Sequence, residues 1–186
     1  MKTIGVILYQ GAGHLHMDAL GKLGFNPTPI YAETNLTQLD GLILPGGESS
    51  VQYAYCLNNG LDEKIRKYAS LKKPILGTCA GAILLSKYSS EKVKGFGLID
   101  VNIIRNFYGR QIKSATVRTD YGNEAIFIRA PKFINVNLSD VEVIDSYAKQ
   151  PIFIKQNNIY CTTFHPELGR LDQNNIISKI YSGFYN

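Results

Sequence analysis

The sequence has few cysteines, no run of apolar residues long enough to cross a membrane, and no internal repeat. Its three cysteines, Cys56, Cys79 and Cys161, are odd in number and have no paired spacing, which argues against a disulfide framework. A membrane-spanning helix needs about 20 consecutive apolar residues, and the short apolar run after Met1 lacks the ending of a signal peptide. We therefore expect a cytoplasmic protein with reduced thiols and no membrane contact.

The composition is typical of one globular domain. Of the 186 residues, 45% are hydrophobic, and a chain of this length can bury a core without disulfides or metals. We expect a single domain over residues 1–186. The formal net charge is +5, but the only local excess of basic residues lies within 64–73. No zinc-finger spacing or RNA-binding signature accompanies it, so we interpret it as a solvated face and expect no nucleic-acid partner and no metal.

Strand and helix patterns alternate in the first half of the chain. Apolar runs predict buried strands at 3–9, 28–31, 41–44 and 74–77. Helical spacing predicts helices at 14–24, 50–58, 61–70 and 80–88. Alternation of this kind indicates a parallel sheet with right-handed crossovers.

The second half has a different pattern. Extended segments are predicted at 98–105, 112–118, 125–129, 141–147, 151–155 and 158–164, followed by a helix at 173–184. Polar turns separate some of these segments, as in hairpins. The whole chain therefore predicts an α/β fold, a three-layer sandwich with a central mixed, mostly parallel sheet and an antiparallel addition.

Cys79 stands at the turn between a predicted strand and a predicted helix. Gly77 and Gly81 flank it, which is the layout of a nucleophile elbow, where the central side chain is exposed at the carboxyl end of a strand. The amino terminus of the next helix favours a thiolate at this position. The alternative is a buried cysteine that serves only as a small hydrophobe.

A base for this thiol follows the last predicted strand. His165 would emerge beside Cys79 if strands 74–77 and 158–164 are neighbours, and Glu167 is placed to orient the imidazole. A packed loop histidine is the alternative for His165. A zinc site formed by Cys79, Cys161 and His165 is a second alternative, but its spacing matches no common zinc motif.

The glycine pair Gly46-Gly47 follows another predicted strand. Backbone N–H groups of such a turn, together with the amide of Ala80, can hold an oxyanion. A plain glycine turn, with Ser49 or Ser50 as the helix N-cap, is the alternative. A phosphate-binding P-loop is excluded because the Gly-Lys-Ser/Thr ending is missing.

These motifs together resemble a known superfamily. Class I glutamine amidotransferases have a Cys-His-Glu triad, and their motifs are similar to Pro45-Gly46-Gly47-Glu48-Ser49, Gly77-Thr78-Cys79-Ala80-Gly81 and Phe164-His165-Pro166-Glu167-Leu168. Further segments resemble the glutaminase subunits of pyridoxal 5′-phosphate synthase: 4–16, Arg105-Asn106-Phe107-Tyr108-Gly109-Arg110-Gln111 and Phe127-Ile128-Arg129-Ala130-Pro131. The resemblance covers essentially the whole chain, in order and with compatible spacing.

The resemblance implies a class I glutamine amidotransferase-like, flavodoxin-like fold and a glutaminase that needs no cofactor. Its substrate would be L-glutamine, and its partner in a hetero-oligomeric complex would be a synthase subunit that makes pyridoxal 5′-phosphate. The triad would be Cys79, His165 and Glu167. The oxyanion would lie near the amides of Gly47 and Ala80. The remaining residues implied to line the glutamine site are Glu48, Ser49, Arg105, Ile128 and Arg129.

Two other functions share some of these motifs. A glutaminase that serves histidine or purine synthesis would share the triad but not the segment 105–111. A thiol-based redox sensor or stress chaperone on a similar fold needs a reactive cysteine but no complete His165–Glu167 pair.

Overall fold

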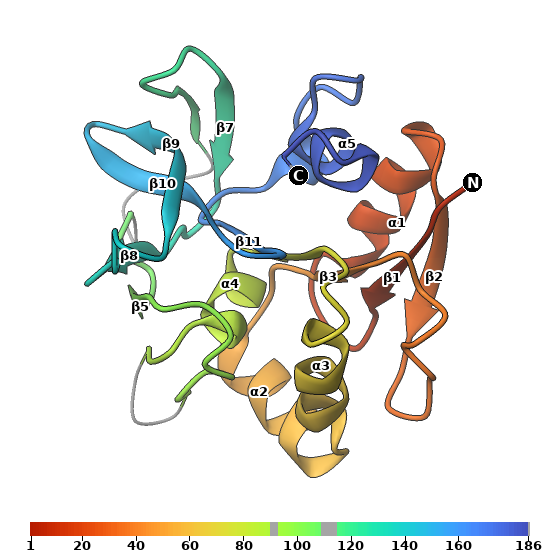
Figure 1. Ribbon diagram of the computed structural model, residues 1–186. Coiled ribbons are helices and arrows are strands. Elements are labelled where there is room, and N and C mark those ends of the chain that lie inside the picture. The colour runs from red at the N-terminus through yellow and green to blue at the C-terminus, as the bar shows by residue number, and fades with distance from the viewer. Residues whose placement is uncertain (90–92, 109–114, 186) are drawn as a thin grey trace.

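A central sheet of seven strands organises the molecule (Figure 1). The computed structural model describes residues 1–89, 93–108 and 115–185. The strand order is β2-β1-β3-β4-β11-β10-β9. The bounds of these strands are β1 Thr3–Ile7, β2 Asn26–Ile30, β3 Gly41–Leu44, β4 Ile75–Thr78, β9 Glu142–Tyr147, β10 Gln150–Gln156 and β11 Ile159–Thr162. The strands from β2 to β11 are parallel to their neighbours, and β10 and β9 add to them in antiparallel fashion, so the predicted mixed, mostly parallel sheet is confirmed.

Helices cover both faces of this sheet and complete three layers. In Figure 1, α1 and α5 lie on one face and α2, α3 and α4 on the other. The helix bounds are α1 Gly13–Lys22, α2 Ser49–Asn58, α3 Leu61–Ala69, α4 Ala80–Leu85 and α5 Ile176–Ser182. Each side has its own apolar cluster: Leu20 and Tyr181 belong to the first, and Leu61 and Ile65 to the second.

The burial of each strand follows from its place in the sheet. Every residue of β3, β4 and β11 is buried, because central strands of a parallel sheet are covered on both faces and are therefore mostly apolar. Strand β2 lies at the edge and carries Pro27 and Pro29. Asn26 donates its N–H inward to the carbonyl oxygen of Lys2, so the alternating prolines take the outward positions, where no partner strand needs a donor.

Two small antiparallel pairs stand beside the main sheet. Strand β5 (Asn102–Ile104) pairs with β8 (Lys132–Ile134), and β6 (Ala115–Arg118) pairs with β7 (Glu124–Phe127). The turn between β6 and β7 contains Gly122, with φ 84°, as expected of a hairpin. These pairs support the segment that carries Ile128 and Arg129.

Several boundaries differ from the sequence-based expectations. The expected strand at 98–105 is reduced to β5, and β8 was not predicted at all. The helix expected at 80–88 ends at Leu85 because Ser86 is extended, with ψ 168°. The closing helix begins at Ile176 rather than 173, where the side chain of Asn175 caps it. Residues 109–114, which include the start of the strand expected at 112–118, lie outside the described residues.

The basic segment within 64–73 is only partly a solvated face. Lys64 donates to the carbonyl oxygen of Ala32, and Lys73 donates to those of Thr37 and Leu39. These lysines therefore tie α3 and the following turn to the loop before β3. In the described part of the chain, none of the helices is both long enough and apolar enough to span a membrane.

Candidate active site

Cys79 lies in the sharp turn between β4 and α4. Its backbone has φ 49° and ψ −103°, a conformation that non-glycine residues rarely adopt and that is typical of strained functional turns. Its N–H donates to the carbonyl oxygen of Thr162 at 2.9 Å, which ties the turn to β11. Gly81 packs directly against the backbone of Leu44, so no Cβ fits there. The turn therefore has the geometry of a nucleophile elbow.

His165 reaches the same edge of the sheet from the next strand. β11 is parallel to β4, with Thr162 opposite Thr78, so the residues that follow the two strands emerge side by side. Gly46 lies between their side chains: a Cβ at Gly46 would be 2.6 Å from His165 Cε1 and 3.5 Å from Cys79 Cβ. The glycine thus allows the thiol and the imidazole to share one side of the 45–47 loop.

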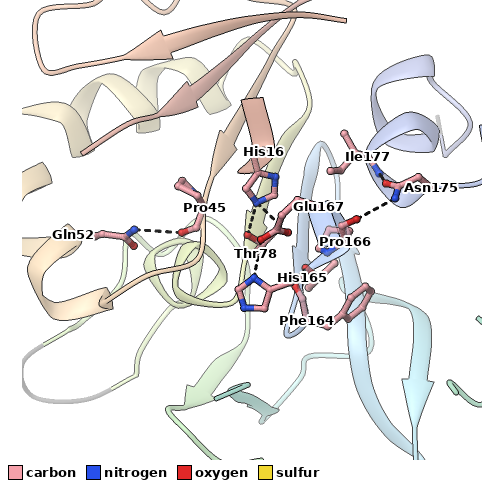
Figure 2. Close-up of polar contacts among 11 residues, drawn as sticks. His16, Pro45, Gln52, Thr78, Phe164, His165, Pro166, Glu167, Asn175 and Ile177 are labelled. Carbon is pink, nitrogen blue, oxygen red and sulfur yellow. Dashed lines mark hydrogen bonds and ion pairs between the residues drawn. The ribbon is translucent and has the colours of Figure 1, made fainter. Parts of the chain in front are cut away.

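Glu167 holds the far nitrogen of this imidazole. His165 Nδ1 lies 2.7 Å from Glu167 Oε1 (Figure 2). The side chains of His165 and Glu167 are 8% and 0% exposed. Burial alone would lower the pKa of His165, but its interactions with Cys79 and Glu167 raise it to about 10. The arrangement therefore favours an imidazolium, the form that pairs with a thiolate and can donate a proton.

The carboxyl of Glu167 is ionised despite its burial. Burial alone would raise its pKa, but His16 and His165 hold it below its usual range. His16 belongs to α1, and its Nε2 lies 3.2 Å from Glu167 Oε2 and 3.0 Å from Thr78 Oγ1. Figure 2 shows the two imidazoles on opposite sides of this carboxylate.

A cavity of about 470 Å³ opens over the thiol. This volume is in the range of sites that bind small molecules. Its lining residues are Gln10, Gly11, Ala12, Leu15, Gly46, Gly47, Glu48, Ser49, Cys79, Ala80, Ile83, Arg105, Asn106, Ile128, Arg129, His165 and Leu168. Three of its lining residues, Cys79, Asn106 and Arg129, are non-glycine residues with positive φ, a conformation that costs free energy and is common at functional sites.

An ion pair lies at the mouth of the cavity. Arg105 Nη2 is 2.5 Å from Glu48 Oε1, and both side chains are partly exposed. The same carboxylate accepts hydrogen bonds from the hydroxyl and the N–H of Ser50 at the start of α2. The Ser50 hydrogen bonds and Arg105 lower the pKa of Glu48. Gln10 Oε1 accepts the N–H of Glu48 at 3.0 Å, which restrains this loop.

The sequence as a whole matches the SNO glutamine amidotransferase family over residues 6–181. This chain belongs to that family. It is 44% identical to the pyridoxal 5′-phosphate synthase subunit PdxT of Caldicellulosiruptor saccharolyticus, over 90% of this chain and 92% of that one. It is 40% identical to the PdxT of Thermoplasma acidophilum, over 89% of this chain and 86% of that one.

Solved structures share the fold of this glutamine amidotransferase. A crystal structure of a glutamine amidotransferase is 28% identical, with a TM-score of 0.83 over 98% of this chain and 95% of that one. The PurLQS structure from Thermotoga maritima has a TM-score of 0.71 at 19% identity, over 98% of this chain and 97% of that one. At that identity the likeness concerns the fold alone.

The site residues expected from the sequence lie together. All of them line the cavity except Glu167, which lies behind His165. Their roles remain predictions. The N-cap of α2 is Glu48, so the cap by Ser49 or Ser50 that belonged to the alternative interpretation of this loop does not occur. The carboxylate of Glu48 reaches the N–H of Ser50 while also facing Arg105, and Ser49 is buried.

The zinc alternative has no support in the geometry. Cys161 is fully buried within β11, where burial raises the pKa of its thiol strongly. Within residues 1–89, 93–108 and 115–185, no three His, Cys, Asp or Glu side chains are grouped so as to hold a metal ion.

The sequence did not predict the residues that hold the glycine loop and Glu167 in place. Gln52 donates to the carbonyl oxygens of Gln10 and Pro45 and so holds the glycine loop. His16 contacts Glu167 on the side away from His165, and it also contacts the hydroxyl of Thr78. One signal was available: His16 falls on the apolar face of a predicted helix, where a polar side chain needs a buried partner.

Proposed function

We propose that this protein hydrolyses L-glutamine to L-glutamate and ammonia, and that it supplies the ammonia to the synthase subunit that builds pyridoxal 5′-phosphate. Membership of the glutamine amidotransferase family supports the first step. The second step is supported by relatives named as pyridoxal 5′-phosphate synthase subunits, which match about nine-tenths of this chain. One observation carries the chemistry: Cys79 lies on a strained elbow beside an imidazole that is bound to a buried carboxylate.

The proposed reaction has two stages at one sulfur. The Cys79 thiolate attacks the side-chain amide carbon of glutamine, and the resulting oxyanion is held by the N–H groups of Gly47 and Ala80. The C–N bond then breaks, and the His165 imidazolium gives its proton to the departing ammonia, leaving a γ-glutamyl thioester. Water attacks the thioester with His165 as base, which releases glutamate and restores the thiol. Glu167 orients His165 and stabilises its charged form in both stages.

The mouth of the cavity suits the other end of an amino acid. Free glutamine carries an α-carboxylate and an α-ammonium group. Arg105 can bind the first bidentately, and Glu48 can bind the second. In the absence of substrate these two side chains neutralise each other, so substrate binding exchanges one ion pair for two. Ser49, Ile128 and Arg129 form the walls between this mouth and the thiol.

We also propose that the protein works in the cytoplasm as part of a hetero-oligomeric synthase complex, without contact to nucleic acid or membrane. Its three cysteines are free thiols, which suits a reducing compartment.

A coupled assay tests the whole proposal. Glutamine is supplied to the purified chain with and without a purified synthase subunit, together with the pentose and triose phosphates, and both glutamate and pyridoxal 5′-phosphate are followed. We expect glutamate release in the complex and vitamin formation that depends on it. Cys79→Ala should abolish both, while added ammonium salts restore the vitamin product. Glutamate release that persists in Cys79→Ala contradicts the assigned nucleophile, and release without any vitamin product contradicts the assigned partner.

A further inference from the structure

His16 is buried against the triad without belonging to it. It projects from α1, and its side chain is 0% exposed. Nε2 lies 3.0 Å from Thr78 Oγ1 and 3.2 Å from Glu167 Oε2, while Nδ1 has no hydrogen-bond partner in the described part of the chain. Thr78 directly precedes Cys79. The imidazole of His16 therefore stands between the strand that ends at the nucleophile and the carboxylate that orients the base (Figure 2).

The neighbours of His16 identify its protonated nitrogen. A carboxylate oxygen only accepts hydrogen bonds, so the nitrogen that faces Glu167 has to carry the proton. Nδ1 faces no acceptor among the described residues and is the unprotonated nitrogen. Burial lowers the pKa of His16, which keeps the ring neutral. His16 is thus a neutral ring whose protonated Nε2 lies 3.0 Å from the Thr78 hydroxyl oxygen and faces the second oxygen of Glu167 at 3.2 Å.

The two oxygens of Glu167 consequently face different histidines. Oε1 is bound by His165 Nδ1 at 2.7 Å, whereas His16 Nε2 faces Oε2 at 3.2 Å. Oε2 makes no well-aligned hydrogen bond with the described residues, which leaves the His16 contact to restrain it. A carboxylate held at one oxygen can pivot about that bond, and a pivot would move His165 away from the sulfur.

We propose that His16 is a positioning residue of the glutaminase reaction, which fixes the Glu167 carboxylate and ties it through Thr78 to the turn that carries Cys79. The proposal rests on the proposed glutaminase function. His16 is absent from the lining of the substrate cavity, so it acts on the reaction only through Glu167. Its loss should therefore lower kcat and leave KM unchanged.

Two substitutions of His16 separate positioning from packing. His16→Leu replaces the imidazole with an apolar side chain of similar size that has no donor. We expect kcat to fall roughly 10–100-fold, in line with the loss of supporting hydrogen bonds around a working ligand or base. His16→Gln retains an N–H near the position of Nε2 and should recover most of this loss. His14→Leu is the matched control, because His14 lies on the same helix but is exposed; we expect it to leave kcat unchanged.

The pH profile of kcat gives a readout that a packing defect alone would not move. The charged and titratable groups around Glu167 are His165 from its own segment, His16 from α1, and Cys79 through His165. Without the His16 donor, the ionised form of Glu167 is less favoured, so the acid limb of the profile in His16→Leu should move upward by about half a unit to one unit. Thr78→Val should move it in the same direction by less, and this variant serves if His16→Leu does not fold.

A second readout is independent of glutamine turnover. Iodoacetamide alkylates the thiolate form of cysteine, and mass spectrometry of the Cys79 peptide separates this residue from Cys56 and Cys161, which are more deeply buried. At pH 7 we expect alkylation of Cys79 in His16→Leu to be roughly three to ten times slower than in the wild type, since the thiolate depends on a well-placed imidazolium. His16→Gln should restore the rate.

The outcomes distinguish the two proposals. If the wild-type complex releases no glutamate from glutamine, the proposed function fails, whereas the alkylation series still tests the role of His16. If the wild type is active, and folded His16→Leu has an unchanged kcat, acid limb and alkylation rate, the positioning role is overturned. A loss in His16→Leu that appears in KM rather than kcat, or that His16→Gln does not rescue, overturns it as well.

Discussion

The two ends of the substrate cavity are built differently. At the inner end, His165 and Glu167 are almost completely buried, and the Glu167 carboxylate is contacted by His165 from its own segment and by His16 from α1. At the mouth, Arg105 and Glu48 form an ion pair whose side chains are 25% and 36% exposed. The inner end is thus protected from water, whereas at the mouth water competes with the partners of the ion pair.

This difference separates two physical tasks. Buried, hydrogen-bonded charges rearrange only at a large cost in free energy. A preorganised environment of this kind stabilises a transition state. An exposed ion pair contributes only about 0–1 kcal/mol to stability and is easily exchanged for another partner. Changes at the inner end should therefore affect kcat, and changes at the mouth should affect KM.

The largest effect is expected from Glu167→Gln at the inner end. The amide keeps the shape but removes the charge that holds His165 as an imidazolium. We expect kcat to fall about 10²- to 10⁴-fold with little change in KM. Steady-state kinetics of glutamate release by the synthase complex measure both constants. A rise in KM without a fall in kcat would contradict the separation of the two ends.

A smaller effect is expected from Arg105→Ala at the mouth. Loss of a charged hydrogen-bond donor to the substrate costs about 1.5–3 kcal/mol, which corresponds to a rise in KM of about 10- to 100-fold. Arg105→Lys keeps the charge but lacks the planar guanidinium. Its KM should lie between those of the wild type and Arg105→Ala. Equal losses of kcat in both variants, with KM unchanged, would place Arg105 in the chemistry instead.

The inner ion pair should also make stability depend on pH. The pKa of His165 is raised from its usual 6.5 to about 10 in the folded protein, so the folded state binds this proton more tightly than the unfolded state does. The resulting stabilisation is complete below about pH 6.5 and is lost as the pH rises towards about 10. Relative to His165→Gln, the wild type should lose on the order of 5 kcal/mol of unfolding free energy over this window, since each pKa unit corresponds to about 1.4 kcal/mol. Denaturant titrations of both proteins at pH 6 and pH 10 measure this loss. If the difference in unfolding free energy between the wild type and His165→Gln is the same at both pH values, the pKa of His165 is not raised.

The smallest effect is expected from Ser50→Ala. This change removes the 2.8 Å hydrogen bond from the hydroxyl to Glu48 but leaves the backbone N–H of residue 50 in place. We expect a loss of about 0.5–1 kcal/mol in unfolding free energy, with kcat unaffected. Thermal unfolding and steady-state kinetics check this, and a large fall in kcat would show that the mouth and the inner end are coupled.

Sequence patterns predicted the parts of the molecule that repeat a simple period. Strands β1, β3 and β4 are apolar runs because both faces are covered, and the turn residues around Cys79 have a strong local signature. The short strand β8 lacks such a signature, since its three residues are held by pairing with β5 rather than by their own pattern. The same limit applies to the site. His165 could be placed beside Cys79 from strand adjacency, whereas the contact of His16 with Glu167 depends on how α1 packs over the sheet, which no local period encodes.

Strand β2 has a consequence for how this protein associates with other chains. Because Pro27 and Pro29 lack N–H groups, the outer edge of the sheet on this side offers almost no donors to an incoming strand. Edge-to-edge polymerisation through β2 is thereby blocked. Assembly with other subunits therefore has to use side-chain surfaces rather than an extension of the sheet at this edge.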